Sequence, residues 1–240
     1  MIPWNMPTEL IKYCEILENK ITGMTVPINK PTGWTSFDVV KKLRNVTGFK
    51  KVGHGGTLDP FASGLLIVGF GSHTKKLSDF LKSDKKYIVT IRTGIKSDTL
   101  DKTGRITVVN DNYILHEDEL IKVLNSYIGE QEQEPPMFSA KKVGGTPLYK
   151  IARKGETVAR KAERINIYSI DLLNISKDRF TIQVSCSSGT YIRTLASQIG
   201  ESLGCGALAE ELTRTETGLY LLENSLTIEE FTKQWKLLAA

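Results

Sequence analysis

The chain of 240 residues carries 32 basic and 27 acidic side chains, a net charge of +5, and is long enough to bury a core as one large domain or two small ones. No apolar run is long enough to span a bilayer and the amino terminus has no signal-peptide pattern, so we expect a cytoplasmic protein with no membrane partner. Three scattered cysteines and three scattered histidines form no metal-ligand or redox motif, and the signatures of phosphate-binding loops and serine esterases are absent. We therefore expect no metal and no cofactor.

Positive charge is concentrated in two segments. Residues 141–164 contain eight basic and two acidic side chains, an excess larger than that of the whole chain, and residues 75–105 contain nine basic and four acidic ones. Clustered positive charge suits a nucleic-acid backbone, because each neutralised phosphate releases counterions. A solvated face without a partner is the commoner meaning of such a run, and charge alone leaves both interpretations open.

Two helices are predicted in the first 48 residues. Thr8 is a candidate cap for a short peripheral helix over residues 8–20, with apolar residues at helical spacing. Ser36 is a candidate cap for a second helix, which carries Val39, Val40 and Leu43 on one face and ends at Gly48.

The most informative segment follows this helix. Residues 53–66 read Gly-His-Gly-Gly-Thr-Leu-Asp-Pro-Phe-Ala-Ser-Gly-Leu-Leu. The glycines permit backbone conformations closed to other residues and a close approach to a ligand. Pro60 restricts Asp59 to extended geometry, which predicts a carboxylate held in one direction beside open backbone. The alternative is a glycine-rich turn in which Asp59 only caps local amides.

The remaining elements alternate irregularly. Strands are predicted over residues 87–93, with Tyr87, Val89, Ile91 and Thr93 on one side, and over residues 179–185. Apolar stripes predict helices over residues 120–128 and 192–203, each stopped by the glycine that follows. Residues 131–150 have neither periodicity and are interpreted as a projecting loop, and residues 227–230 form a capping box that opens a last helix. Strands and helices without strict alternation favour an α+β fold.

The sequence resembles a known family. The segment at residues 53–66 is similar to the catalytic motif of the TruB family of tRNA pseudouridine synthases, and other blocks of that family occur in the same order. They are Asn-Lys-Pro-Thr-Gly-Trp-Thr-Ser at 29–36, Lys-Tyr at 86–87, the stretch 94–104, Pro-Pro-Met-Phe-Ser-Ala at 135–140 and Cys-Ser-Ser-Gly-Thr-Tyr-Ile-Arg at 186–193. Five ordered blocks over residues 25–220 make the resemblance specific.

The resemblance implies a pseudouridine synthase fold, with a central, mixed, largely antiparallel sheet, flanking helices and a thumb-like insertion at about residues 131–164. The catalytic domain is expected over residues 25–222, after an extension of residues 1–24. Residues 223–240 are expected to form a C-terminal helix, since the roughly twenty residues after Tyr220 are too few for the PUA-type RNA-binding domain found in many relatives.

The resemblance also assigns site residues. Asp59 matches the catalytic aspartate, as nucleophile or as base and electrostatic partner of the sugar, Arg193 matches its guanidinium partner, and Tyr87 matches the tyrosine that stacks on the target base. A further set is expected on the RNA side: His54 beside the flipped base, Lys30, whose main role is to brace the catalytic loop, Leu212 near the pocket floor, Tyr191, and Lys141 and Lys142 of the basic segment.

The expected reaction is the isomerisation of uridine to pseudouridine at position 55 in the T loop of tRNA, by base flipping and without a cofactor, in an enzyme that is monomeric and binds the T arm. Three alternatives remain: the same reaction on another RNA, a non-catalytic tRNA-binding and folding chaperone for which Asp59 is dispensable, and a glycosidase-like hydrolase. The last is disfavoured because one carboxylate is strongly placed where two are usual.

Overall fold

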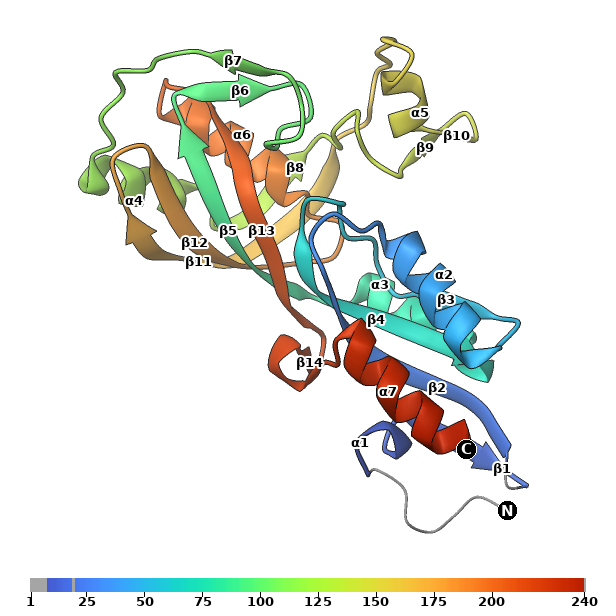
Figure 1. Ribbon diagram of the computed structural model, residues 1–240. Coiled ribbons are helices and arrows are strands. Elements are labelled where there is room, and N and C mark those ends of the chain that lie inside the picture. The colour runs from blue at the N-terminus through green and yellow to red at the C-terminus, as the bar shows by residue number, and fades with distance from the viewer. Residues whose placement is uncertain (1–7, 19, 240) are drawn as a thin grey trace. The chain divides into compact units, whose positions relative to one another are not determined.

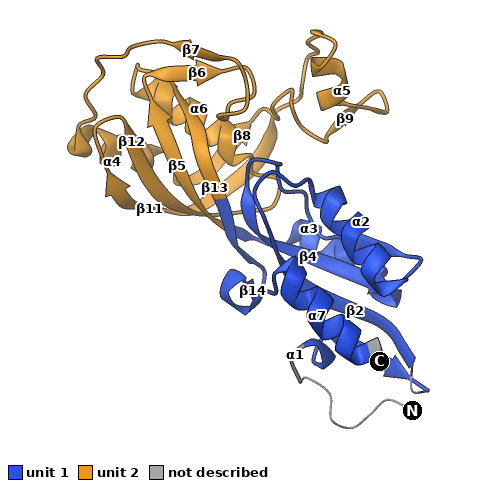
Figure 2. Ribbon diagram, in the orientation of Figure 1, with its two compact units in different colours: residues 1–85, 213–240 blue, residues 86–212 orange. Residues whose placement is uncertain are grey.

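The computed structural model describes residues 8–18 and 20–239, and the chain divides into two compact units (Figures 1 and 2). Unit 1 takes in the described parts of residues 1–85 and 213–240, and unit 2 consists of residues 86–212. The predicted extension at residues 1–24 lies only partly within the described residues. No helix in the described part of the chain has the length and apolar character needed to cross a membrane.

Unit 1 is built on two long central strands. Its elements are α1 (Thr8–Ile11), β1 (Cys14–Leu17), β2 (Lys20–Lys30), α2 (Ser36–Thr47), β3 (Val52–His54), β4 (Ser63–Gly71), a 3-10 turn η1 (Ser72–Lys76), α3 (Leu77–Lys82), the end of β13 (Ala207–Thr217), β14 (Tyr220–Leu221), η2 (Leu222–Asn224) and α7 (Ile228–Ala239). The strand order is β1-β2-β4-β13. β3 pairs with β4, and β4 and β13 are parallel.

Strands β2 and β4 are covered on both faces. Helices α2 and α7 lie on one face, where Met24, Val26 and Ile28 pack in one apolar cluster with Leu43 and Phe231 (Figure 1). On the other face a smaller cluster joins β4 to α3. Because a strand buried on both faces shows no alternation of polar and apolar residues, its period-2 signal is lost.

Unit 2 is an antiparallel sheet with helices. Its elements are β5 (Lys85–Thr93), β6 (Ile95–Ser97), β7 (Ile106–Val108), α4 (Glu117–Ser126), β8 (Gly129–Gln133), β9 (Lys142–Val143), β10 (Thr146–Pro147), α5 (Leu148–Ala152), β11 (Glu163–Ile175), β12 (Arg179–Cys186), α6 (Ile192–Ser202) and the first part of β13. The strand order is β13-β5-β12-β11-β8. The predicted α+β class with a mixed, largely antiparallel sheet is confirmed.

Several local predictions are confirmed. Strand β5 alternates as expected, and α2 ends at Gly48 in the left-handed conformation with φ 72°. The prediction of Ser36 as the cap of α2 is wrong by one residue, since the cap is Thr35, which forms a capping box with Asp38. Thr227 forms the predicted capping box with Glu230 at the start of α7.

Two further local predictions are wrong. The first helix ends at Ile11, because residues 14–17 pair with β2 as the edge strand β1. Residues 131–150 are not all loop. Residues 131–133 end β8, where backbone pairing with β11 replaces the missing sequence pattern, the short strands β9 and β10 pair antiparallel, and α5 begins at Leu148.

Candidate active site

The glycine-rich segment forms the turn between β3 and β4. These strands pair antiparallel, with His54 opposite Val68, and the Gly55 amide donates to the Ile67 carbonyl at 2.8 Å. The Ala62 amide donates to the carbonyl of Asp59 at 3.1 Å, so the residues that follow the aspartate fold back on it. The half-buried Asp59 therefore lies on a short loop anchored in the central sheet of unit 1.

Lys30 braces this loop from beneath. Its side chain is fully buried at the end of β2, and Nζ donates to the carbonyl oxygens of Pro31 at 2.9 Å, Trp34 at 2.7 Å and Ala62 at 2.6 Å. All three N–H donors of the ammonium group are used. This agrees with the predicted bracing role of Lys30 and leaves no donor for RNA. Burial lowers the pKa of Lys30 to about 8, and the nearby charge of Asp59 opposes this shift.

Two further side chains hold the same loop. The buried Ser36 accepts a hydrogen bond from the Leu58 amide at 2.9 Å and donates to the Leu58 carbonyl at 3.2 Å. Arg214, which is 1% exposed, donates from Nε to the Leu65 carbonyl at 2.7 Å and from its terminal nitrogens to the carbonyls of Gly56 at 3.2 Å and Thr57 at 3.4 Å. The residues just before Asp59 are thus fixed by side chains from α2 and β13.

Sequence reasoning missed Arg214. Arg214 lies in a strand whose apolar pattern is interrupted, and the neighbouring sequence does not indicate that its side chain is buried. A partial signal lies at Gly64, whose φ is +104° and where an added Cβ would lie 2.4 Å from the carbonyl oxygen of Arg214. The glycine therefore permits the close approach of β4 to β13 that brings the guanidinium under the loop.

His54, at the end of β3, is half-buried beside this cation. Burial and the positive charge of Arg214 lower its pKa, with burial the larger cause, while a backbone contact with Gly56 opposes the shift. The imidazole is therefore neutral at pH 7. A neutral ring is suited to hydrogen bonding and stacking rather than to pairing with a phosphate.

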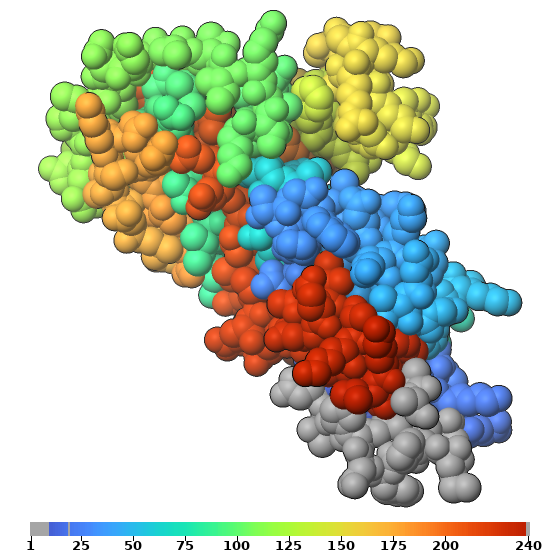
Figure 3. Space-filling model, in the orientation of Figure 1, coloured from blue at the N-terminus to red at the C-terminus, as the bar shows by residue number. Residues whose placement is uncertain are grey.

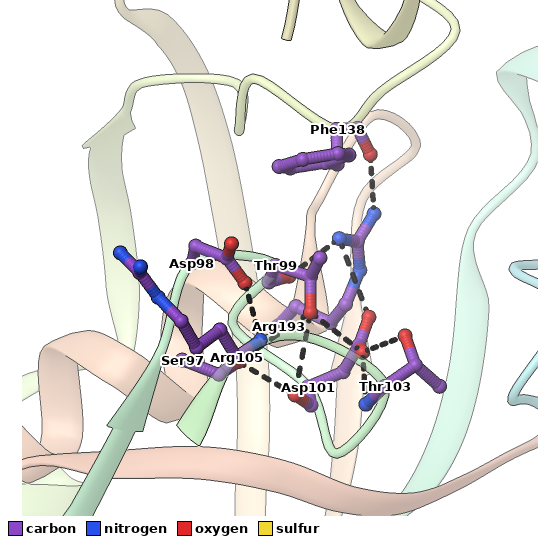
Figure 4. Close-up of polar contacts among 8 residues, drawn as sticks. All are labelled: Ser97, Asp98, Thr99, Asp101, Thr103, Arg105, Phe138 and Arg193. Carbon is purple, nitrogen blue, oxygen red and sulfur yellow. Dashed lines mark hydrogen bonds and ion pairs between the residues drawn. The ribbon is translucent and has the colours of Figure 1, made fainter. Parts of the chain in front are cut away.

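In unit 2 the predicted arginine is buried at the start of α6. The Arg193 side chain donates from Nη1 to the Thr99 carbonyl and from Nη2 to the Phe138 carbonyl, both at 2.8 Å (Figure 4). Its Nη1 lies 3.6 Å from Oδ2 of Asp101, and both side chains are almost fully buried. An arginine early in a helix would ordinarily be a surface residue, so this burial marks a constrained position.

Asp101 is a second residue that the sequence did not reveal. Its Oδ1 accepts from the Thr99 hydroxyl at 2.8 Å and from the amide and hydroxyl of Thr103 at 2.9 and 2.5 Å (Figure 4). The aspartate closes the turn after β6 on itself and presents its other oxygen to Arg193. The partnership of Arg193 with Asp59 stays a prediction, since the two residues belong to different units.

The other predicted residues lie as follows. Tyr87 is on the buried face of β5 at 9% exposure, and Leu212 is buried in β13. The backbone of Tyr191 is held by the side-chain amide of Gln133, at 2.7 and 3.1 Å. Lys142 is exposed in β9, whereas Lys141 forms an ion pair with Glu163. Within residues 8–18 and 20–239, no group of three or more His, Cys, Asp or Glu side chains is placed to hold a metal ion.

Two solved structures are similar to this chain. One is the crystal structure of a Cbf5-Nop10-Gar1 complex, with TM-score 0.70 and 29% identity over 88% of this chain and 54% of that chain. Another is the structure of an H/ACA RNP bound to a substrate RNA containing 2'-deoxyuridine, with TM-score 0.67, 26% identity, and coverage of 88% and 53%. This chain spans about half the length of those two chains.

Sequence relatives make the class more specific. The chain is 41% identical over 209 residues to the tRNA pseudouridine synthase B of Clostridium tetani, covering 87% of this chain and 72% of the relative. It is 45% identical over 202 residues to that of Clostridium kluyveri, covering 84% and 70%. These comparisons describe an isomerase of the pseudouridylate synthase class.

Family models account for most of the chain. Residues 44–192 match the TruB family pseudouridylate synthase N-terminal domain, and residues 193–239 match the tRNA pseudouridylate synthase B C-terminal domain. The chain belongs to the TruB family of pseudouridylate synthases, as the resemblance predicted.

Proposed function

We propose that this chain isomerises uridine to pseudouridine in tRNA, at position 55 of the T loop, with Asp59 as the reacting carboxylate. The observation that carries the proposal is the bracing of the Asp59 loop by Lys30, Ser36 and Arg214, which together engage carbonyl or amide groups on both sides of the aspartate. A reacting group must be held within a fraction of an ångström of its productive position, and such a brace supplies that constraint. The names of the relatives support tRNA as the substrate.

The reaction is balanced without redox chemistry. The bond from the ribose C1′ to the uracil N1 breaks, the base turns, and a bond from C1′ to C5 forms. The proton on C5 leaves and N1 gains one. Asp59 acts on the sugar or the base in its anionic form, which the neighbouring positive charge of Lys30 favours.

Tyr87 and Arg193 complete the proposed machinery. The target uridine has to leave its stack to reach Asp59, and stacking on an aromatic ring offsets part of that cost by about 1–3 kcal/mol. Tyr87 is assigned this role. Arg193 is assigned to the carboxylate of Asp59, with Asp101 and the carbonyls of Thr99 and Phe138 fixing its direction.

The test is tritium release from tRNA transcripts labelled at C5 of uridine, with the parent protein and the Asp59→Asn variant. We expect release by the parent only, and no release at position 55 when the transcript carries cytidine there. Release from other RNAs at equal rates would contradict the tRNA assignment. Equal RNA binding by both proteins with no release from any transcript would contradict catalysis and favour the chaperone.

A further inference from the structure

The surface of unit 1 carries a groove that the proposed machinery does not use. Helices α2 and α7 pack side by side, and their surfaces adjoin on the face shown in Figure 3. One hollow of about 390 Å³ lies along α2, and a second of about 370 Å³ lies between α2 and α7, and Lys42 lines both. We call these two adjoining hollows, which share Lys42, the α2–α7 groove. Its lining residues are Gly33, Trp34, Asp38, Lys41, Lys42 and Asn45, continuing to Ile228, Glu229, Thr232, Lys233 and Lys236.

The groove has a net positive charge. Four exposed lysines, Lys41, Lys42, Lys233 and Lys236, face two carboxylates. Both carboxylates lie in the first turn of a helix, where the positive end of the helix dipole compensates them, and Asp38 is also bonded to the Thr35 amide and hydroxyl. Among the ion pairs between described residues, none includes any of the four lysines.

One end of the groove is tied to the loop that carries Asp59. The Gly33 amide donates to the Pro60 carbonyl at 2.7 Å, and the Trp34 carbonyl accepts from Lys30 at 2.7 Å. The backbone of Trp34 is thereby fixed, while its side chain remains partly exposed, at 36% for the residue. An aromatic ring beside a positively charged groove is the combination by which proteins follow a nucleic-acid strand, with the ring stacking on a base and the lysines facing phosphates.

We propose that the α2–α7 groove binds the phosphodiester backbone of the RNA substrate next to the target nucleotide, with Trp34 stacking on a base. The inference rests on the proposed function for the identity of the RNA. The groove begins at the same backbone segment that positions Asp59, so a strand placed at Asp59 can continue across Trp34 toward Lys42 and Lys233 without leaving unit 1. The expected contacts are with phosphates and an unspecified base, and they add affinity rather than sequence preference.

The test compares two charge-matched double variants. Lys42→Gln with Lys233→Gln removes two charges from the groove, and Lys122→Gln with Lys177→Gln removes two exposed lysines from unit 2 outside both basic segments. Dissociation constants are measured for a T-arm hairpin and for the full tRNA transcript over a series of KCl concentrations. The groove variant is expected to bind about tenfold more weakly, with a slope of log K against log salt reduced by about 1.5, and the control to match the parent.

Catalysis is measured separately under saturating enzyme. The control variant is expected to match the parent in single-turnover rate, and the groove variant is expected to need a higher enzyme concentration to reach its maximal rate, because it binds the RNA more weakly. Trp34→Leu, which keeps the backbone carbonyl, is expected to weaken binding about tenfold without changing the salt slope. An unchanged affinity and slope in the groove variant, or an equal loss in the control, would overturn the proposal. Absence of tritium release by the parent would overturn the proposed function instead, and the binding comparison would still decide the groove.

Discussion

The ammonium nitrogen of Lys30 lies 2.6 Å from the carbonyl oxygen of Ala62, a residue 32 positions further along the chain. This hydrogen bond joins the end of β2 to the loop that carries Asp59. No donor of the ammonium group is left for water, because its other two hydrogen bonds go to the carbonyl oxygens of Pro31 and Trp34. The role of the buried Lys30 ammonium group is therefore to hold backbone segments together rather than to contact the substrate.

Replacing Lys30 by methionine is expected to lower the free energy of unfolding by about 2 kcal/mol at neutral pH, because three buried carbonyls lose their donor. The difference from the parent is expected to grow as pH rises from about 8 toward 10.5. In that window the unfolded chain holds a proton on Lys30 that the folded protein has lost, so the contribution of Lys30 to the free energy of unfolding increases with pH. Urea titrations of both proteins at several pH values measure this, and a constant difference would contradict it.

The pKa of Lys30 also reports on Asp59. Because the charge of Asp59 raises that pKa against the effect of burial, Asp59→Asn is expected to lower it further below about 8. Asp38→Asn is the matched control and is expected to lower it by less, since Asp38 is the weaker of the two favourable charges. An NMR pH titration of labelled lysine side chains measures both shifts. Equal shifts in the two variants would show that Asp59 is not the principal partner.

Gly64 and Gly129 share a φ of +104° but differ in their surroundings. An added Cβ at Gly64 would lie 2.4 Å from the Arg214 carbonyl oxygen, whereas an added Cβ at Gly129 would have none of the surrounding atoms within 4 Å. Gly129→Ala is expected to cost about 1 kcal/mol of stability for the left-handed backbone alone. Gly64→Ala is expected to cost about 3 kcal/mol or more, because β4 and β13 must also separate. Thermal or urea unfolding of the two variants compares them, and equal losses would show that the close approach is unimportant.

The sequence predicted those elements whose residues carry their own signal. Strand β5 alternates along its whole length, and α7 opens on a capping box, so both followed from local pattern. Strands β2 and β4 carry the site but are buried on both faces, and their periodicity is erased by the helices that cover them. Strand β1 forms because β2 offers it an edge, which is information that no local pattern holds.

The candidate site divides in the same way. Asp59 was found because glycines and a proline surround it, and Tyr87 and Arg193 because they fall in blocks of the family. Arg214 and Asp101 were missed because each has a partner far away in the chain: the Leu65 carbonyl is 149 residues from Arg214, and the ion-pair partner of Asp101 is Arg193, at the start of α6. The positions of the residues that support the candidate catalytic residues therefore depend on long-range contacts of buried charged side chains.

Substitutions of Arg214 test whether these supporting residues position Asp59. Arg214→Lys keeps the charge but loses the fork that reaches both Gly56 and Thr57, so the Asp59 loop is less well fixed. We expect the single-turnover rate to fall about 100-fold with the affinity for RNA unchanged, since a misplacement of about 1 Å has this effect. The His54 pKa is expected to stay depressed in this variant, because the positive charge remains.

The companion variant separates charge from geometry. Arg214→Met is expected to slow the reaction as well, and also to raise the pKa of His54 toward its ordinary value, because the repulsion of the guanidinium is removed. Single-turnover tritium release and an NMR titration of the imidazole provide the two readouts. A normal rate in Arg214→Lys together with a slow one in Arg214→Met would mean that the charge at this position is sufficient, and that the hydrogen bonds to the loop do not position Asp59.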